Sequence, residues 1–71
     1  MRRSEVIRRI RAEARMRGLP FLLERQGSRH EIWRCGDVLV PIPRHREIDE
    51  VTVEAGVFRR LEDAFGVGWW R

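Results

Sequence analysis

Hydrophobic residues along this chain change their spacing twice, and the changes divide it into a helix, three short strands and a second helix. Over residues 4–17 the apolar side chains recur every three or four positions, which is the period of an amphipathic helix. Ser4 is a residue type that caps helix starts, and Gly18 and Pro20 are suited to end this helix. Its apolar stripe consists of Val6, Ile7, Ile10 and Ala14.

Three strand-like segments follow, at residues 21–25, at His30–Cys35 and at residues 38–42. The second segment alternates, so its odd-numbered and even-numbered side chains are predicted to face opposite sides of a sheet. Gly36-Asp37 between the last two segments is a two-residue hairpin signal. Pro41 and Pro43 cannot donate ladder hydrogen bonds, so we expect the third strand to lie at an edge or to end early.

A second helix is predicted from Thr52, a suitable cap, to Gly66, with a core face of Val53, Val57, Leu61, Ala64 and Phe65. Because neither helix has another apolar partner, both should cover one face of the small sheet. The expected fold is α+β: one domain over residues 1–71, in the order α-β-β-β-α, with a three-stranded antiparallel sheet. The Trp69-Trp70 tail can either cap this core or serve as an exposed interaction anchor.

Charge is distributed unevenly along the 71 residues. Residues 1–46 hold 12 arginines against five acidic residues, a balance of +7, whereas residues 47–71 hold three against six, a balance of −3. All 15 basic residues are arginine, which fits either the codon usage of a GC-rich genome or the suitability of arginine for phosphate. The positive part favours a polyanionic partner, although a merely solvated helix face gives the same pattern.

Several classes of protein are disfavoured by composition. No run approaches the roughly 18 apolar residues of a membrane span, and the first residues lack the apolar block of a secretion signal. A lone cysteine, Cys35, can form neither an internal disulfide nor a zinc site. Two histidines and scattered carboxylates show no metal-ligand spacing, and no glycine-rich nucleotide loop is present. We therefore expect a cytoplasmic protein with no membrane segment and no cofactor.

His30 is the clearest candidate for a catalytic residue. It stands at the start of a predicted strand, directly after Gly27-Ser28-Arg29, and histidine suits proton transfer near neutral pH. RNA carries its own nucleophile, the 2′-hydroxyl, so His30 could act as the general base. Arg29 or Arg34 would then hold the phosphate, and His45 would be the candidate acid. From the residues alone, the simpler interpretation is that His30 is a half-exposed strand residue and that His45 is a solvated loop residue.

Two segments together resemble the HicA family of toxin ribonucleases, whose fold is like that of a double-stranded RNA-binding domain. They are residues 27–33 (Gly-Ser-Arg-His-Glu-Ile-Trp) and residues 40–48 (Val-Pro-Ile-Pro-Arg-His-Arg-Glu-Ile). Matching through His-x-Ile-Trp makes His30 the equivalent of the catalytic histidine, whereas matching through Gly-Ser would put Arg29 there. The last helix departs from the family because Val51-Thr52 and acidic residues replace its usual Gly-Thr start and basic face.

This resemblance implies the toxin of a type II toxin-antitoxin system. Such a chain would be a metal-independent endoribonuclease that cleaves mRNA with His30 as the catalytic residue. It would be held in check by a HicB-like antitoxin, as a monomer alone or in a hetero-oligomer with that partner. The residues that we expect to contact RNA phosphates are Ser28, Arg29, Arg34, Arg44, His45, Arg8 and Arg11.

Two other functions fit the same sequence. A noncatalytic module could bind structured RNA through the arginine-rich first helix, because duplex RNA is recognised through its phosphates and shape. A small protein-binding factor, of phage origin for example, would instead use the tryptophans. Catalysis requires His30, RNA binding requires the arginines of the first helix, and protein binding alone requires neither.

Overall fold

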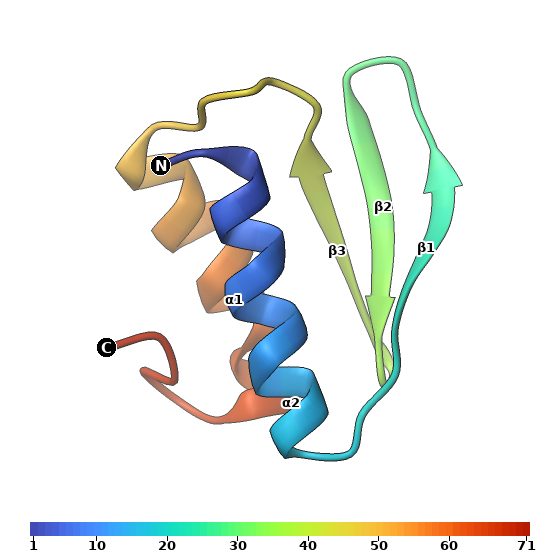
Figure 1. The fold of residues 1–71 in the computed structure, drawn as a ribbon, viewed down its shortest axis with the longest axis vertical. Helices are drawn as coiled ribbons and strands as arrows, with labels where there is room; N and C mark the ends of the chain where they lie inside the picture. Colours follow the sequence, from blue (N-terminus) through green and yellow to red (C-terminus); the bar gives the residue numbers. More distant parts are fainter.

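Two helical segments cover one face of a three-stranded antiparallel sheet, and the other face of the sheet is open (Figure 1). The computed structural model describes all residues from Met1 to Arg71. Helix α1 (Arg3–Met16) is followed by β1 (Phe21–Gln26), β2 (His30–Cys35) and β3 (Val38–Pro43), with β2 in the centre of the sheet. The predicted α-β-β-β-α order is confirmed, and β3 lies at an edge as its prolines predict.

The C-terminal helical segment covers residues 50–65 and contains three kinds of turn. It has π-helical turns at Thr52–Phe58, a 3-10 turn at Arg59–Leu61 and the α-helical turn α2 at Glu62–Phe65. In the π-helical part the Arg59 amide donates to the carbonyl of Glu54, five residues earlier. The wider turn brings Phe58 into the core beside the predicted Val57, so both are buried.

The core lies between the helical segments and the inner face of the sheet. Cys35, Val40 and Ile42 supply the sheet side and are fully buried. Exposed Leu22 and Leu39 lie on the open face, which no other element covers. The twelve core residues are Val6, Ile10, Ala14, Cys35, Val40, Ile42, Ile48, Val53, Val57, Phe58, Leu61 and Phe65.

The C-terminal tail folds back onto this core. The indole N–H of Trp69 donates to the carbonyl oxygen of Phe58 at 2.8 Å. The Trp69 ring meets Phe58 and Phe65 edge-on, with centroids 4.9 and 4.8 Å apart, a favourable aromatic geometry. Trp69 and Trp70 are therefore half-buried, and they take the capping position rather than that of free anchors. No helix has the length and apolar character needed to cross a bilayer.

Both predicted helix caps are wrong. Helix α1 begins at Arg3, and Ser4 makes no capping hydrogen bond. Asp49, and not Thr52, caps the second helical segment, which begins one turn earlier at Glu50. The Asp49 carboxylate accepts from the Thr52 amide at 3.0 Å and from the Thr52 hydroxyl at 2.7 Å. These hydrogen bonds to Thr52 lower the pKa of Asp49, because they stabilise its charged form.

We predict that Asp49→Ala lowers the melting temperature at neutral pH, because the helix start loses its acceptor. Asp49→Asn should keep the cap and lose its pH dependence. Since the pKa of Asp49 is lowered by folding, the charged cap stabilises fully above the carboxyl's ordinary pKa. That contribution is lost as the pH falls through the lower folded pKa. Thermal unfolding of wild type and both variants between pH 2 and 7 measures this. A wild-type profile parallel to that of Asp49→Asn would contradict it.

Candidate functional site

The start of β2 is fixed by three hydrogen bonds across the turn at residues 27–29. The Gly27 amide donates to the carbonyl oxygen of His30 at 2.8 Å, and a Cβ on Gly27 would lie only 2.8 Å from that oxygen. Arg44 closes the turn from the other side, since its guanidinium donates to the Gly27 carbonyl at 2.9 Å and its amide to the Arg29 carbonyl at 3.0 Å. Glycine is required here for close approach, and the result is a defined backbone position for His30.

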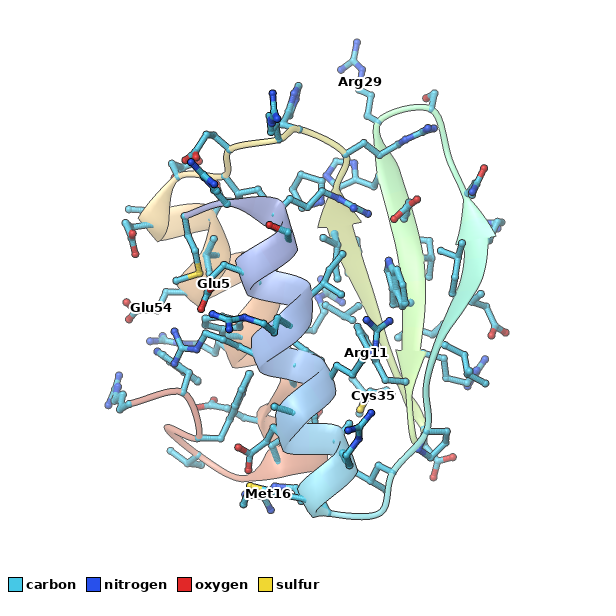
Figure 2. All side chains as sticks on the ribbon, viewed as in Figure 1. Glu5, Arg11, Met16, Arg29, Cys35 and Glu54 are labelled. Carbon is cyan, nitrogen blue, oxygen red and sulfur yellow. The ribbon has the colours of Figure 1, made fainter.

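Three of the sequence-predicted site residues line one surface hollow of about 300 Å³. Arg29 and His30 come from the hairpin tip and the first residue of β2, and His45 comes from the loop after β3. His30 is exposed and pairs across the sheet with Pro43, which forms part of the same hollow. Figure 2 shows Arg29 projecting from the tip of the β1–β2 hairpin. The remaining lining residues are Glu47, Ile48, Asp49 and Thr52.

The hollow has a basic side and an acidic side. Glu47 and Asp49 contribute carboxylates to it, and the lowered pKa of Asp49, caused by its hydrogen bonds to Thr52, keeps that group charged at neutral pH. These carboxylates repel a phosphate. An anion is therefore favoured only at the side that Arg29 and the two histidines form. No group of three or more metal-ligating side chains is arranged to hold a metal ion.

Arg34, Arg44 and Ser28 do not belong to this hollow. Arg34 shares the open face of the sheet with His30, but four residues of extended strand place it about 13 Å away. It makes a two-pronged pair with Glu24 at 3.1 and 3.2 Å, which lowers the pKa of Glu24. Arg44 is committed to the Gly27 carbonyl, and Ser28 is exposed in the turn. Of the two predicted phosphate ligands, Arg29 alone lines the hollow that contains His30.

Arg8 and Arg11 lie elsewhere, in a second hollow of about 440 Å³ along α1. The Arg11 guanidinium carbon is 5.7 Å from the centre of the Phe21 ring and 6.0 Å from that of Trp33, and those rings stack on each other. Arg8 pairs with Glu5, whereas Arg11 has no carboxylate within ion-pair distance. The full lining is Arg3, Ser4, Ile7, Arg8, Arg11, Ala12 and Arg15.

Sequence reasoning missed that Arg3 and Arg15 also line this hollow, although Arg3 is already paired with Glu31 and bonded to the Pro43 carbonyl oxygen. The arginine surface of α1 is therefore the side that carries Arg8, Arg11 and Arg15. The signal was present, because positions 3, 7, 11 and 15 repeat at four-residue intervals and share one side of a helix. Arg15 also lacks an acidic partner within ion-pair distance. Basic side chains thus gather in two separate places. One is the side of the hollow formed by Arg29, His30 and His45, which we call the histidine hollow. The other is the arginine surface of α1.

No family model, no curated protein and no solved structure matches this chain. The resemblance to the HicA family, carried by residues 27–33 and 40–48, stays a prediction.

We predict that Gly27→Ala displaces the first residue of β2, because the added methyl group would meet the His30 carbonyl oxygen. The amide of Arg44, which bonds to Arg29 across this turn, should then exchange its hydrogen faster. Ser28→Ala is the matched control, since Ser28 is exposed. Hydrogen exchange followed by NMR measures both variants. Equal protection of the Arg44 amide in Gly27→Ala and wild type would refute the requirement for glycine.

Proposed function

We propose that this chain is a metal-independent endoribonuclease that cleaves mRNA, as the resemblance to HicA toxins implies. The observation that carries the proposal is the shared hollow of Arg29, His30 and His45. These residues come from two segments of the chain, and each was a candidate from the sequence before the structure placed them around one hollow. A base, an acid and a cation around one opening are the minimum equipment for cutting RNA at the 2′-hydroxyl.

In the proposed reaction His30 removes the proton of the 2′-hydroxyl through an imidazole nitrogen. The 2′-oxygen forms a bond to the adjacent phosphorus, and the bond from phosphorus to the 5′-oxygen breaks. His45 donates a proton to that departing oxygen, which leaves a 2′,3′-cyclic phosphate and a free 5′-hydroxyl. Arg29 holds the charge that develops on the phosphoryl oxygens. The mechanism therefore requires His30 to accept a proton and His45 to donate one.

The arginine surface of α1 supports the same function because it can bind RNA phosphates at a second position, distant from the cleavage site. Arg11 and Arg15 have no acidic partner in the chain, so binding a phosphate breaks no existing ion pair. Phosphate neutralisation by arginine releases counterions, and binding should weaken as salt rises. Arg8 would have to leave Glu5, an exposed pair whose loss costs little.

A HicB-like antitoxin in the same cytoplasmic compartment is part of this proposal. The histidine hollow lies at the surface, where His30 and His45 are exposed, so a protein bound over it would block RNA. We propose a hetero-oligomer with that partner as the inactive form and the free chain as the active form.

A noncatalytic RNA-binding module is the second candidate, and the α1 surface favours it. That surface has the larger hollow and includes Arg11 and Arg15, which pair with no carboxylate. RNA binding there needs neither histidine. The two candidates differ in one respect: the module binds RNA and leaves it intact.

We predict that His30→Ala reduces RNA cleavage about 10²–10⁴-fold, because it removes the general base. Its stability should be close to that of wild type, since His30 is exposed. Cleavage of a labelled mRNA fragment, with host growth after induced expression, measures the effect. Intact RNA with the folded wild-type chain, or equal cleavage by His30→Ala, would contradict the ribonuclease.

We predict that Arg11→Gln combined with Arg15→Gln weakens RNA binding and makes the slope of log affinity against log salt less steep by about 1 for each lost phosphate contact. Fluorescence anisotropy with an uncleavable 2′-O-methyl RNA measures this separately from catalysis. Arg17→Gln is the matched control, because Arg17 is paired with Glu13 on α1's last turn and lies outside the hollow. Unchanged affinity and slope in the double variant would remove α1 from the RNA-binding surface.

A further inference from the structure

Arg3 connects the three backbone segments that surround the histidine hollow. Its Nε donates to the carbonyl oxygen of Pro43 at 2.9 Å, and its Nη2 donates to the carboxylate of Glu31. Its backbone amide donates to the carbonyl oxygen of Arg46 at 2.8 Å. One residue at the start of α1 therefore holds the first part of β2, the end of β3 and the loop that follows.

Each residue that Arg3 contacts is a neighbour of His30 or His45, the two histidines of the proposed reaction. Glu31 follows His30 in β2, and Pro43 is the cross-strand partner of His30. Arg46 follows His45 directly. The positions of both histidine backbones are thus tied to the same side chain and amide, although Arg3 itself does not line the histidine hollow.

We propose that Arg3 is a positioning residue, which holds His45 at a fixed separation from His30. This inference rests on the proposed ribonuclease, because it assigns both histidines to one reaction. Arg3 acts through the backbone and through Glu31 and makes no contact with the scissile phosphate. Holding catalytic groups in place matters because a displacement of about 1 Å can cost about 10²-fold in rate.

The chemistry of the contacts calls for arginine at this position. Nε and Nη2 of one planar guanidinium reach two acceptors on different strands, which a lysine ammonium on a flexible stem does not reproduce. The pair is largely shielded, with side-chain exposures of 23% for Arg3 and 13% for Glu31. The indole N–H of Trp33 donates at 3.2 Å to the same Oε1 of Glu31 that receives Arg3, so this carboxylate oxygen has two donors that orient it.

The first test separates positioning from substrate binding by steady-state kinetics on a short RNA. Arg3→Gln should lower kcat about 10- to 100-fold and leave KM within about threefold of wild type. Arg3→Lys should not restore kcat, because it lacks the planar fork. Arg17→Gln, which removes an exposed pair at the other end of α1, should match wild type. A raised KM with unchanged kcat would make Arg3 a phosphate ligand, and recovery in Arg3→Lys would show that charge alone suffices; either overturns the proposal.

The second test needs no cleavage activity and keeps the inference separate from the proposed function. Hydrogen exchange of the Arg44 amide, which bonds to the Arg29 carbonyl oxygen, and of the Ile48 amide, which bonds to the Met1 carbonyl oxygen, should accelerate in Arg3→Gln. Amides of the β1–β2 ladder should keep their protection. Glu31→Gln should give a smaller change of the same kind if Arg3→Gln does not fold. If the wild-type chain proves inactive but exchange changes as described, the ribonuclease proposal is wrong and the positioning role of Arg3 in the fold is supported. Unchanged exchange would contradict the positioning role.

Discussion

Twelve side chains packed between two helical segments and one face of the sheet form the hydrophobic core of this chain. A domain of this size buries only about 60% of the surface of its unfolded chain, so it has too few apolar residues to cover the second face of the sheet as well. Burial of a single face then fixes the direction of every side chain in β2, because strand residues alternate. Cys35 and Trp33 turn inward, and His30 is left on the open side. The exposure of the proposed base follows from the packing of residues that have no chemical role.

The histidine hollow depends on contacts that bring together distant parts of the chain. Arg44 ties the end of β3 to the β1–β2 turn, and Arg3 ties α1 to β2, β3 and the following loop. Both use arginine as a structural donor to backbone carbonyls, so an excess of arginine does not translate directly into phosphate-binding capacity. The arginines that remain without acidic partners, such as Arg11 and Arg15, are the more informative part of the charge.

The sequence predicted the order of elements well because each signal was local. Alternation and the Gly36-Asp37 turn placed β2 at its observed bounds, and the two prolines identified an edge strand. The Thr52 cap was wrong because residue preference identifies only types of residue, whereas in the structure Thr52 donates both its amide and its hydroxyl to the Asp49 carboxylate. Arg34 was placed on the correct face, but its separation from His30 and its pairing with Glu24 depend on the register of β1. The π-helical turns that bury Phe58 have no periodic signature that a 3.6-residue pattern can detect.

The prolines of β3 have a consequence for how copies of this chain can associate. The amide of Arg44 points toward the hairpin, so by alternation positions 43 and 41 turn toward the outer edge, where proline offers no N–H. A strand added at that edge would find carbonyl acceptors but only one donor, the Leu39 amide. The other edge strand, β1, carries no proline, although its register with β2 shifts between Leu23 and Arg25. Two copies joined through β1 would form a sheet with a proline-bearing strand at each end, where the missing donors would disfavour further strand addition, so the edge chemistry opposes fibres.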